Sequence, residues 1–363
     1  MDGMHKNILK VILFLLMLCQ SNDGHTKSFK VVFLNPGFPA QNHTGNFWSN
    51  VTLFMEAAAT DLDIELVTIY AQRDHILMRS MIKDIIAQKP KYVVLVNEKG
   101  IALDIIKQLA ANEIASFMLL NNLSSKDLSS LTRKEKQLLK GSVIPNNYSA
   151  GKKLFNGLVN LYPSAPNKFI TLLSLQGDYT TPASLERERG LADALKYNKS
   201  VTAIDNTIAN WSKEQAYKKI KGILQHAHID IIWTANDAMA FGAKKAIEES
   251  NIGYPIYIGG INWDIDDPHY PINLSYGGHV ALGAQSLIML KDIDNNYLVI
   301  DERHQVIDIF ESSLSPYYKN FTQRLSQNKL EYYNFSRFSL SSAMPLTFTV
   351  ENLSKAYDER TTN

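Results

Sequence analysis

The chain has 363 residues, of which 45% are hydrophobic and 20% are charged, and its formal net charge is +1. This length is too great for one compact domain of typical size, so we expect two domains. Because the net charge is small and the Lys and Arg residues are dispersed along the chain, no nucleic-acid partner is expected.

The first 21 residues have the pattern of a secretory signal peptide. Lys6 and Lys10 precede an apolar run over residues 11–18, and this run is shorter than the ~20 apolar residues of a transmembrane helix. Removal of residues 1–21 would also remove Cys19, the single cysteine, and would leave an exported protein that has no disulfide. Two alternatives remain open: a single N-terminal membrane anchor, and a lipoprotein modified at Cys19.

Apolar strands and amphipathic helices alternate from residue 29 onwards. In the first half, strands are expected at residues 29–34, 64–70, 92–96, 115–120 and 141–144, with helices at 46–61, 76–88 and 101–111 and a polar excursion at 124–140. In the second half, strands are expected at 169–174, 200–205, 229–233 and 255–258, with helices at 183–195 and from Ser212 and Asn236. This alternation predicts parallel sheets with right-handed crossovers, and the two runs predict two similar α/β domains.

The pattern is less regular beyond residue 270. An extended segment is expected at 271–276, a helix at 279–297, a strand at 305–310 and a helix at 315–327. Residues 331–363 mix aromatic and polar side chains, and their sequence allows no assignment.

Two asparagines mark the ends of neighbouring predicted strands. Asn236 comes after the strand at 229–233 and is placed to cap the next helix, and Asn262 follows the pair Gly259-Gly260 one helix later. The carboxyl ends of parallel strands meet at one edge of a sheet, where open α/β sheets bind small ligands. The sequence therefore predicts a binding cleft at this edge.

Four segments, taken in order, make the chain resemble the type I periplasmic binding proteins, the family of ribose-binding protein and the autoinducer-2 receptor. They are the pair Phe47-Trp48, the segment NNYSAG at 146–151, ASLERERGL at 183–191 and TANDAMA at 234–240. The resemblance covers about residues 28–311. It implies an α/β fold of two Rossmann-like parallel-sheet lobes, joined by a three-strand hinge, with the ligand between them.

The resemblance also implies the lobe boundaries. The N-terminal lobe is expected at 28–143 plus 278–306, the C-terminal lobe at 144–277 plus 307–330, and an extension at 331–363. The segment 275–279 is expected at a hinge crossing, where Gly277 and Gly278 suit a backbone that changes its dihedral angles on closure.

The family's ligand-binding positions map onto polar and aromatic side chains of this chain. Arg187 matches the family's arginine, whose five N–H donors suit hydroxyls or a carboxylate, with Arg189 as a competitor. Asn97 and Asn121 end the third and fourth predicted strands of the first lobe and face the same gap. Asn262 stands where many sugar binders have an aspartate, and Asn121-Asn122 replaces an aspartate-arginine pair of the family. The full set of ligand-binding candidates comprises Phe47, Trp48, Asn97, Asn121, Arg187, Trp211, Asn236, Asn262, Trp263 and His279.

Aromatic rings of this kind stack on sugars, although at least one of Phe47 and Trp48 is expected in the lobe core and His279 could be structural. The set suits a small polyhydroxylated ligand, and no metal, cofactor or catalytic residue is expected.

The predicted function is a periplasmic solute-binding protein, monomeric when free, whose lobes close over a sugar or an autoinducer-like ligand. Its closed form would then be presented to an ABC permease or to a membrane sensor such as a histidine kinase or a diguanylate cyclase, and the unusual tail favours a sensor. The alternatives are a hydrolase built on Asp264, Asp266 and Asp267, and a sugar-responsive transcriptional repressor. The signal-peptide pattern argues against the repressor, because it stands where a helix-turn-helix would be.

Overall fold

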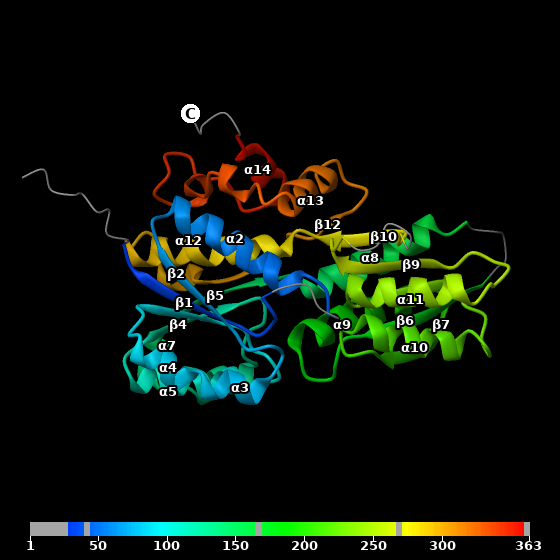
Figure 1. Cartoon of the computed structure of the whole chain (residues 1–363), viewed down its shortest axis with the longest axis horizontal. Helices are drawn as coiled ribbons and strands as arrows, with labels where there is room; N and C mark the ends of the chain where they lie inside the picture. Colours follow the sequence, from blue (N-terminus) through cyan, green and yellow to red (C-terminus); the bar gives the residue numbers. More distant parts are fainter. Residues whose placement is uncertain (1–27, 40–43, 164–168, 266–270, 359–363) are drawn as a thin grey trace, which may run out of the picture.

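The computed structural model describes residues 28–39, 44–163, 169–265 and 271–358; the predicted signal peptide, with Cys19, lies outside this part. Two six-stranded sheets with packed helices form two lobes that lie beside each other along the long axis of the molecule (Figure 1). This arrangement confirms the predicted fold class. Within the described residues, no helix has both the length and the apolar character that crossing a membrane requires.

The N-terminal lobe is built on a parallel sheet with the strand order β11-β5-β4-β3-β1-β2. Its strands are β1 (Lys30–Asn35), β2 (Glu65–Tyr70), β3 (Tyr92–Leu95), β4 (Ala115–Leu119), β5 (Leu139–Pro145) and β11 (His304–Ile307). Successive residues of β1 point to opposite faces, so Val31 and Phe33 join one core and Val32 and Leu34 join another. Burial on both faces explains why these strands read as continuous apolar runs.

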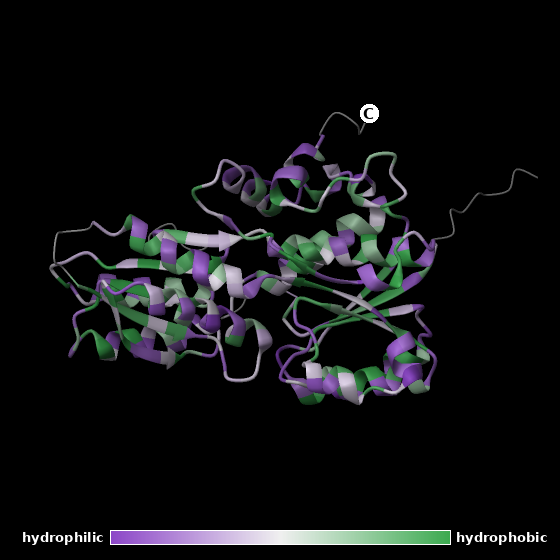
Figure 2. Ribbon diagram, turned by 180° about the vertical axis from the view of Figure 1, so that it is seen from behind, coloured by the Kyte–Doolittle hydropathy of each residue, from purple (hydrophilic) through white to green (hydrophobic). Residues whose placement is uncertain are grey.

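Two sets of helices cover these two faces. The first face packs against α2 (Phe47–Asp61) and α12 (Leu282–Asp294), and the second against α3 (His75–Ser80), α4 (Ile82–Ala87) and α5 (Ala102–Ala111). The polar excursion forms two short helices, α6 (Ser125–Ser130) and α7 (Arg133–Leu138). Figure 2 shows apolar residues concentrated on the strands, whereas the outer helices carry many hydrophilic ones.

The C-terminal lobe has the strand order β12-β10-β9-β8-β6-β7. The strands are β6 (Ile170–Gln176), β7 (Val201–Ile208), β8 (Ile231–Thr234), β9 (Tyr257–Asn262), β10 (Leu274–Gly277) and the short antiparallel β12 (Glu311–Ser312). Its helices pack as two pairs, α8 (Asn147–Leu161) with α9 (Pro182–Tyr197), and α10 (Lys213–Ile223) with α11 (Asp237–Glu249). A Cβ atom on Gly151 would lie 2.0 Å from the Arg187 carbonyl oxygen. Glycine therefore allows the close α8–α9 approach that sets the position of Arg187.

The chain passes between the lobes three times. The crossings run from β5 to α8, from β10 to the 3-10 helix His279–Ala281, and from β11 to β12. The amide of Asn146 donates to the Ile307 carbonyl at 2.8 Å, which ties the first crossing to the third. Gly278 has a φ of 99° at the second crossing, a conformation that favours glycine.

The C-terminal segment belongs to the N-terminal lobe. The sequence placed 307–330 in the C-terminal lobe, but there only β12 joins that sheet, and α13 (Tyr318–Ser326) packs on α2, with Phe321 stacked on Phe54 at 5.3 Å. The 3-10 helices Leu330–Tyr332 and Phe335–Phe338 and the helix α14 (Val350–Lys355) continue over the same face (Figure 1). Residues 313–358 therefore form a cover over the N-terminal lobe, held by buried aromatic side chains.

Candidate ligand-binding site

A cavity lies between the lobes, where the carboxyl ends of strands from both sheets face each other. It encloses about 590 Å³ of empty space, part of it open to solvent, which is within the range of small-molecule sites. The residues that line it are Thr44, Phe47, Trp48, Arg73, Glu98, Leu120, Asn121, Pro145, Asn147, Thr181, Ala183, Arg187, Trp211, Asn236, Asn262 and His279.

Eight of the ten candidate residues line this cavity, although their role in binding stays a prediction. These eight are Phe47, Trp48, Asn121, Arg187, Trp211, Asn236, Asn262 and His279. Asn97 lies beside the cavity with its side chain engaged, because its amide nitrogen donates to the Asn122 carbonyl at 2.9 Å and its oxygen accepts from the Ala102 amide at 3.3 Å. The side chain of Asn97 thus anchors the start of α5.

Trp263 does not line the cavity, in contrast to the prediction from sequence. Its side chain is 2% exposed, and its ring contacts Tyr318 and Phe321 with centroid distances of 5.3 Å. The backbone φ angles of Asn262 and Trp263 are 154° and 61°. This unusual pair of angles lets Asn262 line the cavity while the next side chain enters the hydrophobic core beneath the C-terminal cover.

Arg187 is held by three hydrogen bonds in the interior. Its Nε donates to the Asn147 side-chain oxygen at 2.9 Å and its Nη1 to the Ala235 carbonyl at 2.5 Å, and its Nη2 lies 3.2 Å from Nε2 of His279. Burial lowers the pKa of Arg187 to about 9. Arg189, the competing arginine, is exposed and pairs with Glu186 at 2.5 Å. Of the two arginines, Arg187 lines the cavity and Arg189 does not.

His279 is buried between two phenyl rings, with centroid distances of 4.9 Å to Phe47 and 4.5 Å to Phe310. Burial, and then the charge of Arg187, lower the pKa of His279 well below its ordinary value. Its Nδ1 has no hydrogen-bond partner among the described residues. The imidazole is therefore neutral near pH 7 and presents an acceptor to the Arg187 guanidinium.

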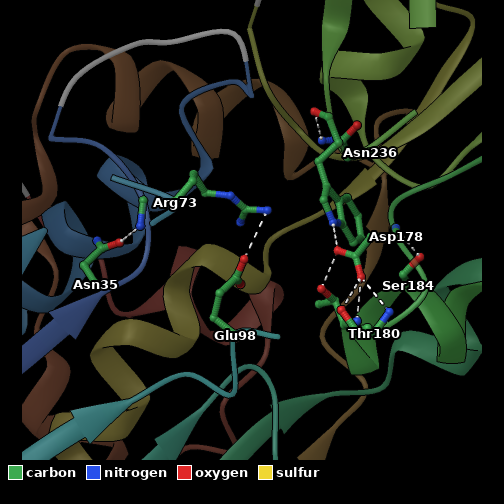
Figure 3. Close-up of polar contacts among 10 residues, drawn as sticks. Asn35, Arg73, Glu98, Asp178, Thr180, Ser184 and Asn236 are labelled. Atoms are coloured by element: carbon green, nitrogen blue, oxygen red, sulfur yellow. Dashed lines mark hydrogen bonds and ion pairs between the residues drawn. The ribbon is translucent and has the colours of Figure 1, made fainter. Parts of the chain in front are cut away.

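Trp211 is fixed in place by a polar network of the C-terminal lobe, whose members Asp178 and Asn236 are labelled in Figure 3. Its indole nitrogen donates to Asp178 at 2.7 Å, and its carbonyl accepts from the Asn236 amide at 3.3 Å. Burial alone would raise the pKa of Asp178, but hydrogen bonds led by that from the Thr181 hydroxyl outweigh it and lower the pKa. Asn236 also caps α11 through the Met239 amide at 3.0 Å, so the predicted cap and cavity roles share one side chain.

The lobes touch at the rim of the cavity. The side-chain oxygen of Asn121, at the end of β4, accepts a hydrogen bond from the Ala183 amide at the start of α9, at 3.0 Å. This bond joins the two lobes directly.

The sequence reasoning missed an ion pair in the cavity wall. Arg73 lies 3.2 Å from Glu98, whose side chain is only 2% exposed, and both come from loops of the N-terminal lobe (Figure 3). Arg73 follows Gln72, and both have left-handed φ angles, of 62° and 52°. The available signal was their position just after β2 and β3, the same strand-end rule that identified Asn121.

Backbone strain gathers at the cavity. Four lining residues that are not glycine, Arg73, Leu120, Trp211 and Asn262, have φ angles of 62°, 65°, 60° and 154°. Such angles cost energy and persist where the surrounding structure enforces them, often at functional sites. Asn262 is the last residue of β9, and the other three lie within three residues of the end of a strand, so these unusual angles occur at strand ends that border the cavity.

The hydrolase alternative rests on three aspartates, of which only Asp264 lies among the described residues, and Asp264 does not line the cavity. Asp264 is buried and accepts a hydrogen bond from the Asn262 amide at 3.1 Å, and Asp266 and Asp267 lie outside the described residues. Burial, followed by the charge of Asp264, raises the pKa of its neighbour Asp237 well above the ordinary value. In the part of the chain that the structure describes, no cluster of side chains suits a metal ion.

The chain belongs to the periplasmic binding protein domain family, whose model matches residues 37–265. This family is made up of solute-binding proteins, and it implies a periplasmic location.

Curated relatives include a D-apiose import binding protein of Paraburkholderia graminis, 22% identical over 62% of this chain and 65% of that protein. A fructose import binding protein of Bifidobacterium longum is 27% identical over 41% of this chain and 43% of that protein. The matches thus span less than two thirds of these relatives.

Solved structures extend the likeness over most of the chain. A periplasmic sugar-binding protein from Pseudomonas fluorescens superposes with a TM-score of 0.78 and 26% identity, covering 90% of this chain and 99% of that one. A galactofuranose-binding protein superposes with a TM-score of 0.67 and 18% identity, covering 82% and 99%. The fold is therefore that of the two-lobed sugar-binding proteins.

Proposed function

We propose that this protein is a periplasmic binding protein that closes over a small sugar. The observation that carries the proposal is the cavity between the lobes, walled by the rings of Phe47, Trp48 and Trp211 and by amide and guanidinium groups. Flat rings bury the apolar faces of a sugar, and the polar groups satisfy its hydroxyls. Two relatives are named as import binding proteins for D-apiose and for fructose, and these names support a sugar as the ligand.

Closure follows from the division of the lining between the lobes. A ligand that contacts Trp48 from one lobe and Trp211 from the other gains both sets of contacts only when the lobes are together, so it shifts the population toward the closed form. The Asn121–Ala183 hydrogen bond adds a direct contact to that form.

We propose binding without turnover. Among the described lining residues the single carboxylate is Glu98, and it is paired with Arg73. Glycoside hydrolysis normally uses two carboxylates about 5–10 Å apart, and the described wall does not offer such a pair.

We further propose that a signal peptide at residues 1–21 exports the protein, and that its monomeric closed form is recognised by a membrane protein. Import relatives favour an ABC permease as this partner; the cover over the N-terminal lobe favours a sensor such as a histidine kinase or a diguanylate cyclase. Deletion of the gene separates the two, because loss of sugar uptake indicates transport, whereas intact uptake with a lost response to the sugar indicates sensing.

The binding function is tested by thermal unfolding of the mature protein with neutral pentoses and hexoses. A sugar present at 100 times its Kd should add about 2.7 kcal/mol of stability. Trp211→Ala, and Asn236→Ser, which keeps a capping oxygen but loses the amide, should abolish the shift. Phe169→Ala, at a side chain that is 68% exposed, is the control and should keep it. An equal shift in all four proteins would reject this cavity as the site.

A further inference from the structure

The cavity wall carries an unbalanced positive charge. Its charged members among the described residues are Arg73, Glu98 and Arg187. Glu98 lies 3.2 Å from Arg73, so these two charges compensate each other. His279 adds no charge near pH 7, because burial and the neighbouring guanidinium hold its pKa well below the ordinary value. The balance leaves the charge of Arg187 without a counterion in the wall.

The partners of Arg187 are all neutral. They are the side-chain oxygen of Asn147, the carbonyl of Ala235 and the imidazole of His279. No ion pair joins this guanidinium to a carboxylate among the described residues. The rings of Trp211 and Phe310, with centroids 5.8 Å from the guanidinium carbon, offset part of the cost of burial. Buried charges in proteins are normally paired, so this arrangement is incomplete.

Two carboxylates of the C-terminal lobe, Asp178 beside Trp211 and the buried Asp237, accept their hydrogen bonds from groups other than Arg187. Asp178 accepts five hydrogen bonds, from the amides and hydroxyls of Thr180 and Thr181 and from the Trp211 indole. Asp237 acts on Arg187 through its field, but its oxygen accepts from the Ser275 hydroxyl at 2.7 Å and from the Asp264 amide at 3.0 Å. Burial beside Asp264 favours the neutral form of Asp237. Neither group forms an ion pair or a hydrogen bond with the guanidinium among the described residues.

Arg187 keeps donors free for a ligand. A guanidinium has five N–H groups, and the three hydrogen bonds above use one on each of its three nitrogens. One N–H remains on each terminal nitrogen, and Arg187 lines the cavity. Two N–H groups on the terminal nitrogens are the set that receives a carboxylate in two parallel hydrogen bonds.

We propose that the preferred ligand of this cavity is an acidic sugar, a uronic or aldonic acid, whose carboxylate binds Arg187. The inference rests on the proposed sugar-binding function and narrows its ligand class. The carboxylate completes the charge balance from the C-terminal lobe, and the rings of Trp48 and Trp211 hold the carbon skeleton. The paired Arg73 and Glu98 offer a donor and an acceptor for hydroxyls from the N-terminal lobe.

Matched pairs of sugars test this directly. Isothermal titration of the mature protein at pH 7 would compare D-galactose with D-galacturonate, D-glucose with D-glucuronate and D-gluconate, and D-arabinose with D-arabinonate. We expect the acid of at least one pair to bind at least tenfold more tightly than its neutral partner. Arg187→Gln, which keeps an amide donor but loses the charge, should bring that ratio close to one. Arg189→Gln, at the exposed arginine paired with Glu186, is the matched control and should keep it.

The wild-type ratio decides the matter even if Arg187→Gln does not fold. Neutral sugars that bind as tightly as their acids, or more tightly, would overturn the acidic ligand and leave the sugar-binding function standing. A preference for the acid that survives in Arg187→Gln would overturn the role of Arg187. Failure of both members of every pair to bind would overturn the acidic ligand and count against the sugar-binding function as well.

Discussion

Trp263 offers the sharpest test of the structure, because its sequence position predicted a ligand contact and the fold buries it in a core. We expect Trp263→Ala to destabilise the protein strongly and to leave sugar affinity nearly unchanged. Truncation of a buried Trp costs about 3–5 kcal/mol. The 5.3 Å ring contacts with Tyr318 and Phe321 place the loss toward the upper end, since each aromatic pair adds ~0.5–1.5 kcal/mol beyond burial.

A second substitution separates the packing of Trp263 from its polar group. The indole nitrogen has no hydrogen-bond partner among the described residues, and a buried unpaired donor costs about 1–3 kcal/mol. Trp263→Phe keeps a ring and removes this donor, so its loss of stability should be well below that of Trp263→Ala.

Urea unfolding followed by far-UV circular dichroism measures these losses, and titration with a sugar that binds the wild type measures affinity. Trp211→Ala is the matched control, and it should lose less stability than Trp263→Ala, because Trp211 is only partly buried, but lose much more affinity. A loss below about 1 kcal/mol for Trp263→Ala, compared with the usual cost of such truncations, would refute the assignment of this side chain to the core. So would a tenfold loss of affinity at unchanged stability.

Three further predictions concern the hinge and two buried titratable groups. Gly278→Ala would force alanine to a φ of 99° and bring its Cβ to 2.5 Å from a Val350 methyl. The urea midpoint should therefore fall by the equivalent of ~1–3 kcal/mol. An unchanged midpoint would contradict this prediction. Burial, and then the charge of Arg187, depress the pKa of His279 in the folded protein. On acidification, the unfolded chain therefore binds this proton at a higher pH than the folded protein does. The stability that neutral His279 contributes should therefore be fully present above about pH 6.5 and fall below it. His279→Gln should show a smaller fall in stability below this pH. Parallel curves of stability against pH for the wild type and His279→Gln would contradict this prediction. Burial alone would raise the pKa of Asp230, but hydrogen bonds led by that from the Thr171 amide outweigh it and lower the pKa. The contribution of Asp230 is present above its ordinary pKa of 3.8 and is lost as the pH falls, so Asp230→Asn should lower stability at pH 7 and remove part of the acid-dependent loss. Acid unfolding of the wild type and of Asp230→Asn, followed by circular dichroism, tests this prediction. Equal slopes of stability against pH for the two proteins would contradict it.

The sequence was sufficient for the fold class because the signals that specify it are local. Strand ends also located the cavity and three of its lining residues, because side chains at the ends of parallel strands reach one edge whatever the details of packing. Asn121, Asn236 and Asn262 were found in this way, and Arg187 and Trp211 came from the family resemblance.

The same reasoning could not find Arg73 and Glu98, or separate Trp263 from the cavity. Charged residues in loops usually face solvent, and sequence alone does not reveal that the left-handed backbone at Arg73 turns it toward a buried carboxylate. Trp263 is one residue away from a cavity side chain, and the aromatic partners that receive it in the core, Tyr318 and Phe321, come from a distant part of the sequence.

By itself, then, the sequence determined the alternation of strands and helices, the two parallel sheets and the edge at which a ligand would be sought, because hydrophobic period and capping act within a few residues. Only the tertiary structure decided that residues 313–358 cover the N-terminal lobe, because their aromatic side chains find apolar partners on a helix more than 250 residues earlier. It also decided the charge balance around Arg187, since that balance depends on which carboxylates lie within a few ångströms of the guanidinium and in which direction they point.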